Sequence, residues 1–484
     1  MPEHVQSLLI AGVGPHAQRF YLPAIATLGP RYGIRLAATI ELETGRAAAA
    51  KALSAIGLEA EILTVPRFEA EMPEETRQAL DAVANRLRPR ALIVATDPLC
   101  HRPYVLWALQ RGMDVLLDKP ITTRRNAVSD VNAARNIERD FEEISAAWHT
   151  ARQQRPVIVS VCAHRRYHPG FEEAIRIVRE VCQQMGCPVT NIYAYHADGQ
   201  WRFPEEIRTQ DHHSYHSGHG KASHSGHHFF DCVYRYYQAG TASGKSADSM
   251  NIYASFVQPR GLLRQLTRQD YERLFGPEYA NVCPYSDAEL DKLFQDFGEV
   301  DVNAVITFSR EGVAMGQASL SLLHNSFSRR GWLYPAADLY KGNGRVKHEH
   351  HRIHIGPFLT VAIHSYQAKS DHSFSDESDL QLGGNNHFEI HLFRNTRMIG
   401  GKEVEVIHLD HLAGFDRSRL YIEQVKEGVV GEFFRYLSGQ LPEADLRSPL
   451  TDHVIPVRMI SAVYESHVKA QQGDNPVIVK PLKR

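Results

Sequence analysis

An acid, a lysine and a proline follow a short apolar run in the first quarter of the chain. The run is Met113–Leu117, and Asp118, Lys119 and Pro120 come directly after it. Desolvation and a neighbouring cation both lower the pKa of a lysine, which can then exchange a proton with a substrate hydroxyl. Pro120 pushes the residue before it toward an extended backbone. We therefore consider Lys119 a candidate catalytic residue, with a solvated surface lysine as the alternative.

Histidine is the unusual residue of this chain, with 27 copies, and many of them gather between Asp211 and Asp231. The run ends at His224–Asp231 and leads into an expected helix that continues through Tyr237. An imidazole changes charge near neutral pH and can donate to or accept from a reacting oxygen. The run can therefore serve proton transfer, the alternative being a helix whose histidines face solvent or core.

The same histidines raise the question of a metal site. His224 and His228 are spaced i, i+4, and five more histidines are close in sequence: His212, His213, His216, His219 and His227. Such spacing can bind zinc or nickel. However, no glutamate stands beside the first histidine and no third ligand is obvious. We expect no metal.

A glycine-rich turn follows the first apolar run of the chain, Gln6–Ala11. Gly12, Gly14, His16 and Ala17 lie in a G-x-G-x-x-A pattern that opens a helical segment ending near Leu28. The first glycine permits a tight turn, the second lets the backbone approach a pyrophosphate, and the small third residue lets helix and strand pack closely. The helix N-terminus then faces the anion. This pattern predicts a dinucleotide site.

The second strand bears on which dinucleotide binds. It covers Leu36–Ile40 and is followed by Glu41, which could accept hydrogen bonds from both hydroxyls of a ribose. Arg46, five residues later, could instead meet a 2′-phosphate. The sequence therefore favours NAD and leaves NADP as an alternative.

Strands and helices must alternate to hold these residues at one edge of a sheet. Six runs are expected to be parallel strands: Gln6–Ala11, Leu36–Ile40, Ala60–Val65, Ala91–Ala95, Met113–Leu117 and Pro156–Ala163. After the first helix, four more are expected at Glu43–Ile56, Pro73–Leu87, His101–Arg111 and Asn126–Trp148. This alternation predicts an α/β fold with an N-terminal Rossmann domain, a doubly wound parallel sheet over residues 1–155.

The pattern changes after residue 170. β-rich runs appear at Val189–His196, Met250–Val257, Val300–Phe308, Val313–Leu323, Ile353–Ile363, His387–Phe393 and Glu403–Leu409. Helices are expected at Ser418–Leu437 and Leu450–Gln471, before a short run at Pro476–Val479. We expect a C-terminal α+β domain over residues 156–484 with a large open, mostly antiparallel sheet, and insertions near 258–298 and 324–352.

The order of elements and the tripeptide together resemble the glucose–fructose oxidoreductase / inositol dehydrogenase (Gfo/Idh/MocA) family. Its members carry Glu-Lys-Pro or Asp-Lys-Pro here, after a small-Thr-x-Pro turn and a helix that begins near a histidine, as at Thr96, Pro98 and His101. Arg165–Pro169 resembles the family's Arg-Arg-aromatic-x-Pro, and His224–Asp231 its Asp-x-Gly-x-His-x-x-Asp segment. The resemblance implies that His228 is the active-site histidine, that Asp231 one helical turn later orients it, and that His224 stands in the place of the family's acid, so these three join Lys119 as candidate catalytic residues. The resemblance implies a cofactor site of Gly12, Gly14, His16, Ala17, Glu41, Thr96, Pro98, His101, Asp118, Lys119, Pro120 and Arg166.

For function, the resemblance implies an NAD(P)-dependent dehydrogenase or reductase acting on CH–OH groups. Hydride would pass between nicotinamide and a hydroxyl or carbonyl carbon of a sugar, cyclitol or related polar metabolite. One departure matters, because the family's first aspartate in its histidine segment is His224 here. That leaves open a redox-neutral, NAD-dependent glycosidase of the same fold. A non-catalytic dinucleotide-binding sensor is the second alternative, although Lys119 and His228 are retained.

Composition limits the partners. The chain has 484 residues with a formal net charge of −2, which argues against nucleic acid or an anionic membrane as the main partner. No apolar run approaches the ~20 residues that cross a bilayer, and the first residues lack the pattern of a signal peptide. Six cysteines in so long a chain form no disulfide framework. We expect a cytoplasmic protein, a homodimer or homotetramer through its C-terminal sheet.

Overall fold

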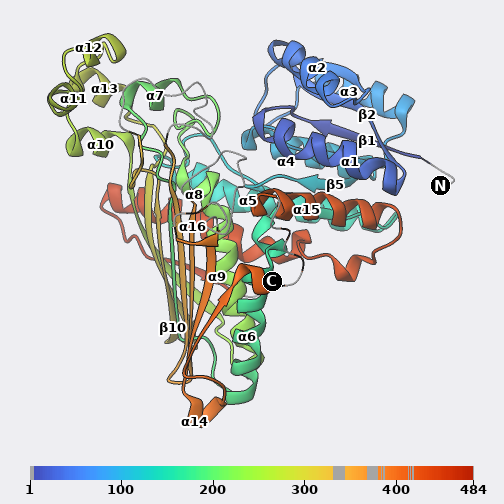
Figure 1. Ribbon diagram of the computed structural model, residues 1–484. Helices are drawn as coiled ribbons and strands as arrows, with labels where there is room; N and C mark the ends of the chain where they lie inside the picture. The colour runs from blue at the N-terminus through green and yellow to red at the C-terminus, as the bar shows by residue number, and fades with distance from the viewer. Residues whose placement is uncertain are drawn as a thin grey trace. The chain divides into compact units, whose positions relative to one another are not determined.

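The computed structural model describes residues 5–330, 344–367, 380–382, 384, 387–412, 414, 416 and 419–482. The chain forms two compact units (Figure 1). The first, called the Rossmann unit below, comprises Met1–Thr123, Ile137–His168 and Ile422–Val457. The second, called the sheet unit, comprises Arg124–Asn136, Pro169–Tyr421 and Arg458–Arg484. Each unit is therefore assembled from segments far apart in sequence.

The Rossmann unit contains a parallel sheet whose described strands follow the order β3-β2-β1-β4-β5-β6. Their bounds are β1 Gln6–Ala11, β2 Ile34–Leu42, β3 Glu61–Val65, β4 Ala91–Val94, β5 Asp114–Leu117 and β6 Val159–Val161. The order reverses between β1 and β4, and ligands bind at the carboxyl ends of strands beside such a point. The expected doubly wound parallel sheet is confirmed.

Helices follow the strands as expected, with one correction. The bounds are α1 Leu22–Tyr32, which continues a π-helical turn (η1) over Ala17–Tyr21, α2 Arg46–Ala55, α3 Glu74–Leu87, α4 His101–Gln110 and α5 Val131–Arg152. The expectation that a helix begins at Asn126 was wrong. Asn126 has φ of 59°, and residues 126–130 form a turn because the Asn126 and Val128 amides donate to the carbonyls of Ser217 and Gly218. A long-range contact thus replaces the first helical turn.

The sheet unit contains a larger sheet with the order β14-β13-β12-β11-β7-β10-β9-β8-β15 among the described residues. Its strands are β7 Asn191–Ala197, β8 Ser249–Val257, β9 Asp301–Arg310, β10 Val313–Leu323, β11 Lys347–Ile355, β12 Leu359–Gln367, β13 His387–Arg394, β14 Val404–His408 and β15 Ile478–Pro481. In this described part only β10 and β7 pair in parallel. The expectation of a large, mostly antiparallel sheet is confirmed.

One expected strand, Ile353–Ile363, was wrong in detail. It is two antiparallel strands, β11 and β12, joined by a turn at residues 356–358. Gly356 has φ of 44°, so this glycine supplies the backbone conformation that the turn needs. The apolar residues on both sides of Gly356 made the segment look continuous. Of the expected insertion near 324–352, residues 331–343 lie outside the described residues, and its end belongs to β11.

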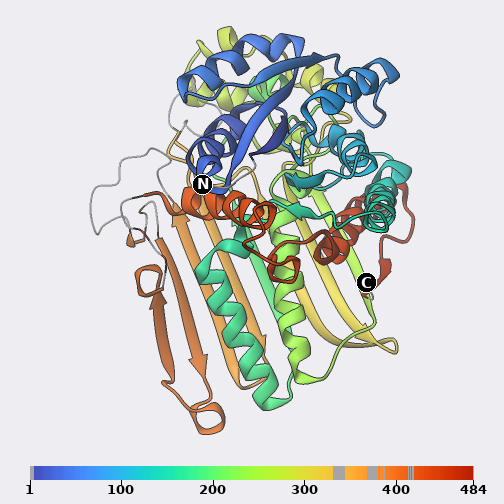
Figure 2. The same ribbon diagram turned by 90° about the vertical axis from the view of Figure 1, so that its right-hand side faces the viewer.

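Two helices cover one face of the large sheet. They are α6 Pro169–Met185, which packs on β11, β12 and β13, and α9 Gly226–Gly240, which packs on β7 and β10 (Figure 2). The opposite face carries exposed apolar side chains, among them Tyr193, Tyr253 and Val305. In the described part, no helix is both long and apolar enough to cross a bilayer.

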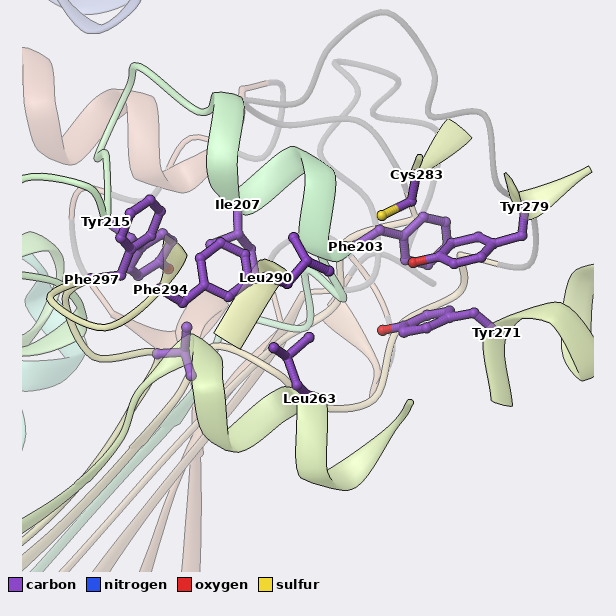
Figure 3. Packing of buried hydrophobic residues seen from close by; sticks show 11 residues of the cluster. Phe203, Ile207, Tyr215, Leu263, Tyr271, Tyr279, Cys283, Leu290, Phe294 and Phe297 are labelled. Carbon is purple, nitrogen blue, oxygen red and sulfur yellow. The ribbon is translucent and has the colours of Figure 1, made fainter. Parts of the chain in front are cut away.

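The segment expected as an insertion, 258–298, folds into helices with their own core. These are α10 Pro259–Gln265, α11 Arg268–Phe275, α12 Tyr279–Val282 and α13 Asp287–Leu293. Their apolar side chains pack with Ile207 of helix α7 (Pro204–Thr209), with Phe203 just before that helix, and with Tyr215 (Figure 3). Tyr215 belongs to the histidine run, so this core fixes where the run begins.

Candidate active site

The glycine-rich turn has the geometry that a dinucleotide needs. Gly12 has φ of +86°, and a Cβ there would lie 2.5 Å from the carbonyl oxygen of Ala95. A side chain is therefore excluded at Gly12. At Gly14 a Cβ would meet no atom within 4 Å, so the space above that backbone is open. Together they form a tight turn with an open second glycine, which fits close approach of a pyrophosphate.

Glu41 lies beside this turn. Its carboxylate accepts a hydrogen bond from the Val13 amide, with Oε2 2.7 Å from the nitrogen, and another from the Leu42 amide at 2.7 Å from Oε1. Ala17, the third small residue of the pattern, is buried at the start of η1. The structure thus brings the predicted ribose-binding acid and the predicted phosphate-binding turn together, so these residues fit a dinucleotide.

His101 joins the ends of two strands. The ring is fully buried at the start of α4, with Nδ1 2.8 Å from the Pro120 carbonyl oxygen and Nε2 3.2 Å from that of Thr96. Burial lowers the pKa of this imidazole, although the two carbonyls oppose that effect. Pro98 begins the short helical turn just before His101. The Asp97 side chain caps this turn by accepting a hydrogen bond from the Leu99 amide at 3.0 Å. His101 therefore fixes the turn after β4 against the turn after β5.

The Asp-Lys-Pro tripeptide lies at the carboxyl end of β5. Asp118 is buried, and its Oδ1 accepts a hydrogen bond from the Lys119 amide at 2.8 Å. The other oxygen, Oδ2, lies 3.6 Å from Nε2 of His16, a residue of the glycine-rich turn. His16 in turn stacks at a tilt on Phe20, with ring centroids 4.9 Å apart. Lys119 and the glycine-rich turn are thus linked through one carboxylate.

Arg166 has a different environment from the other predicted cofactor contacts. It is buried in the helical turn His164–Tyr167, and its guanidinium donates to the Arg447 carbonyl at 2.9 Å and to Oδ2 of Asp452 at 3.0 Å. Next to it, the Tyr167 hydroxyl donates to Glu432 at 2.6 Å. These contacts join β6 to the late segment of the Rossmann unit, so they give Arg166 a structural role. Its role toward a cofactor stays a prediction.

The predicted histidine site belongs to the sheet unit. His224 ends a short helix, α8 (Lys221–His224), whereas His228 and Asp231 lie in α9, and all three side chains are buried. The His224 ring stacks on His213 with centroids 4.7 Å apart and an interplanar angle of 16°. A Cβ at Gly226 would lie 2.9 Å from the Lys221 carbonyl oxygen, so a small residue is needed between the two helices.

Backbone contacts hold the run that precedes these helices. The Gly218 carbonyl accepts a hydrogen bond from the Val128 amide, and a Cβ on Gly218 would lie 2.5 Å from the Asn126 Cα. Gly220 packs equally closely, because its Cβ would lie 2.0 Å from the Glu299 carbonyl oxygen. The glycines of the run therefore serve close packing between backbones, which the spacing of the histidines did not indicate.

Sequence reasoning missed a buried charge cluster around Lys221. Its ammonium donates to Oδ2 of Asp198 and lies 3.0 Å from Nδ1 of His196, while Arg345 binds the other Asp198 oxygen at 2.6 Å. Burial lowers the pKa of Lys221. Burial alone would raise the pKa of Asp198, but the cations around it, chiefly Lys221, hold that pKa well below its usual value. The available signal was a single lysine inside a run of histidines.

Metal binding was the other chemistry considered for the histidines. Across the described ranges, no group of three or more histidine, cysteine, aspartate or glutamate side chains is arranged to hold a metal ion.

Comparison with known proteins addresses the fold and the family. Residues 7–153 match the model of the GFO_IDH_MocA family, described as an oxidoreductase family with an NAD-binding Rossmann fold. A comparison with curated proteins finds no match.

Solved structures share the fold over nearly the whole chain. Aldose-aldose oxidoreductase from Caulobacter crescentus, complexed with glycerol, is 16% identical with a TM-score of 0.54, covering 99% of each chain. Levoglucosan dehydrogenase in complex with NADH and L-sorbose is 11% identical with a TM-score of 0.58, covering 99% of this chain and 100% of that one. An oxidoreductase from Agrobacterium radiobacter, in complex with NAD+, L-tartaric acid and magnesium, is 11% identical with a TM-score of 0.56, covering 99% and 98%. The resemblance seen in the sequence is confirmed for residues 7–153, which match the NAD-binding Rossmann fold of the Gfo/Idh/MocA oxidoreductase family.

Proposed function

We propose that this NAD-binding oxidoreductase transfers a hydride between nicotinamide and a hydroxyl or carbonyl carbon of a sugar, cyclitol or related polar metabolite. One observation carries the proposal. Lys119 lies at the carboxyl end of β5, and the adjacent Asp118 connects through His16 to the glycine-rich turn. This position supports Lys119 as the group that exchanges the proton beside the dinucleotide.

The roles we assign follow from this placement. The bound dinucleotide would supply or accept the hydride. Lys119 would take the proton from, or return it to, the substrate oxygen, and His228 would hydrogen-bond that oxygen. Asp231, one helical turn after His228, would orient the imidazole, and His224 stands where relatives carry an acid. Gly12, Gly14 and Glu41 would hold the dinucleotide.

The substrate class is supported by chemistry and by structural neighbours. A lysine and histidines suit proton transfer at a hydroxyl, and hydroxyls are what polyols and sugars offer. Two proteins that share this fold also support a sugar-like substrate: the aldose-aldose oxidoreductase and the dehydrogenase complexed with L-sorbose. NAD is the cofactor we propose, with Glu41 as the residue that selects it over NADP.

The first experiment asks whether the cofactor exchanges. The purified chain is denatured, and the supernatant is assayed for dinucleotide by absorbance and mass. We expect little release, followed by binding in an NADH fluorescence titration and turnover of NAD with a panel of sugars and cyclitols. Near-stoichiometric release, with turnover that does not depend on added NAD, would favour the redox-neutral glycosidase instead. A chain that neither carries nor binds a dinucleotide would contradict the proposal.

We also propose that the chain forms a homodimer or homotetramer through the open face of its large sheet. Large apolar side chains are exposed on that face, including Tyr193, Tyr253 and Val305, which are 37%, 44% and 48% exposed. Tyr253 and Val305 are register partners on neighbouring strands, so their side chains lie together. Large apolar side chains exposed on one sheet face favour an interaction site there.

A further inference from the structure

The large sheet carries a second group of histidines on its strands β11 to β14. Phe388 of β13 packs against Phe171 of α6 with ring centroids 5.4 Å apart, so this register position faces the helices. Side chains alternate along a strand, and register partners on neighbouring strands share a face. Seven histidines therefore lie on the open face and are called the histidine patch below: His348, His350, His354, His364, His387, His391 and His408.

Imidazole rings of the patch lie close to one another. The centroids of His350 and His364, register partners on β11 and β12, are 4.7 Å apart. The centroids of His364 and His391 are 5.3 Å apart, and those of His348 and His350 are 5.5 Å apart. Three more rings border the patch, with these centroid distances: Tyr195 5.7 Å from His350, Tyr366 4.1 Å from His348, and His411 5.3 Å from His408.

Glu389 is the carboxylate of this surface. Its Oε2 lies 3.0 Å from Nε2 of His391. Its Oε1 lies 3.5 Å from Nε2 of His387 and 3.4 Å from Nδ1 of His408. Within the described strands β11 to β14, the other side chain of this face that is charged at neutral pH is Arg352. These two charges cancel while the imidazoles are neutral, and each protonated imidazole then adds a positive charge.

The patch is continuous with the apolar part of the open face. One row of register partners crosses the sheet from β8 to β14: Tyr253, Val305, Ser319, Tyr193, Arg352, Ala362, His391 and Val406. Val406 is 36% exposed, and Phe393 and Val404, which pair in the adjacent row, are 46% and 53% exposed. Exposed apolar side chains thus lie on both sides of the histidines.

The surroundings of the patch favour neutral imidazoles. Burial and, after it, the imidazoles of His350 and His391 lower the pKa of His364 to about 4. Arg352 acts in the same direction on this pKa, and Glu389 acts against it. Burial also lowers the pKa of other members of the patch, namely His348, His350, His354 and His387. These side chains are therefore uncharged at neutral pH and gain charge as the medium becomes acidic.

We propose that a second copy of this chain covers the histidine patch, so that two copies associate near neutral pH and separate on acidification. This inference rests on the proposed assembly through the open face and is independent of the reaction at Lys119. A face whose charges cancel at neutral pH offers an acidic or a basic partner no complementary charge, whereas its exposed apolar and aromatic side chains suit contact with the same face of another copy.

The pH dependence follows from the symmetry of such a contact. In a two-fold interface both copies use the same surface, so the patches add like charges to one contact when they are protonated. A charged imidazole is disfavoured in the contact and better solvated in the separate chain. Separate chains therefore bind protons more tightly than the assembly does, and a fall in pH shifts the equilibrium toward separate chains.

The first measurement is the dissociation constant of the full chain as a function of pH. Light scattering after size exclusion, run over a series of concentrations, gives this constant at each pH. We expect it to rise at least about tenfold between pH values of about 8 and 5, and to recover when the pH is restored. Circular dichroism limits the comparison to pH values at which the chain stays folded. A constant that is the same throughout this range overturns the inference and leaves the assembly in place.

A triple variant identifies the groups responsible. His350→Gln, His364→Gln and His391→Gln, combined, keep polar side chains that carry no charge at these pH values. The variant should associate at neutral pH as the wild type does and should lose most of the pH dependence. His364→Gln alone, with a smaller loss, serves if the triple variant folds poorly. His149→Gln changes an exposed histidine of α5 and should keep the wild-type dependence. A folded triple variant with the wild-type dependence overturns the inference.

Labelling tests whether the second copy covers the patch. Diethyl pyrocarbonate modifies accessible neutral imidazoles, and mass spectrometry reads each site. His408, which is 46% exposed in the single chain, should react several-fold more slowly in the assembled protein than after dilution below the dissociation constant. The exposed His149 should react equally in both. Equal labelling of His408 places the patch outside the interface and overturns the inference. A chain that is monomeric at every pH contradicts the assembly and the inference together, and leaves the proposed reaction untouched.

Discussion

Lys119 is the residue on which the proposed chemistry depends. Lys119→Met keeps the length of the side chain and removes its proton, so kcat should fall by roughly 10²–10⁴-fold, the usual contribution of a general acid or base. The affinity for NADH should change little, because Asp118 and the glycine-rich turn remain. Steady-state rates and an NADH fluorescence titration check both expectations. A methionine variant with wild-type kcat would contradict the assignment.

Glu299 gives a second prediction at the level of one residue. It is fully buried, and its Oε1 accepts from the Ala222 amide at 2.7 Å and from the Tyr464 hydroxyl at 2.8 Å. Burial raises the pKa of this carboxyl from 4.5 to about 7. Between these two values the unfolded chain releases a proton that the folded chain keeps, so stability falls as pH rises through that window.

Glu299→Gln tests this sign. The wild type should lose roughly 3 kcal/mol of unfolding free energy from this group as pH rises from about 4.5 to 7. The variant has no proton to lose there, so its stability should fall less over the same range. Urea unfolding at a series of pH values measures the difference. Parallel curves for the two proteins would show that Glu299 does not titrate in this window.

At the level of elements, the glycine-rich turn separates folding from cofactor binding. Gly12→Ala forces a Cβ to within 2.5 Å of a carbonyl oxygen at a positive φ, so both the melting temperature and NADH affinity should fall. Gly14→Ala places its Cβ in open space, so the melting temperature should hold while NADH affinity drops at least about tenfold. Calorimetry and the NADH titration, run on both variants, give the contrast. Equal NADH affinity in Gly14→Ala and the wild type would place the dinucleotide elsewhere.

Elements with a regular local pattern could be predicted, whereas those set by distant contacts could not. The apolar runs Gln6–Ala11 and Val313–Leu323 became β1 and β10 with the same bounds. The start of α5 was missed because residues 126–130 bond to the histidine run, almost a hundred residues away.

The site shows the same division. The glycine-rich turn, Glu41 and Asp118–Lys119–Pro120 are local motifs at strand ends, and the structure brings them to one sheet edge as their order predicted. The charge cluster of Lys221, Asp198 and Arg345, by contrast, forms only through the sheet register. Asp198 lies 23 residues before Lys221 in the chain, and Arg345, which binds Asp198, lies far beyond it. Side chains that meet through tertiary packing leave no local pattern.

At the scale of the whole molecule, the open sheet face decides whether the chain works alone. Tyr253→Lys adds a charge at the centre of the exposed apolar pair formed with Val305. If two copies meet through this face, the interface buries the new charge, so the assembly should dissociate to monomers. The melting temperature of the protein should change little, because Tyr253 is half-exposed in the single chain. Leu274→Lys, an equally exposed apolar residue on α11 at 48%, is the matched control and should keep the wild-type mass. Light scattering after size exclusion measures all three proteins. A wild type that is monomeric, or a Tyr253→Lys variant that keeps the assembled mass, would show that copies of the chain do not associate through this face.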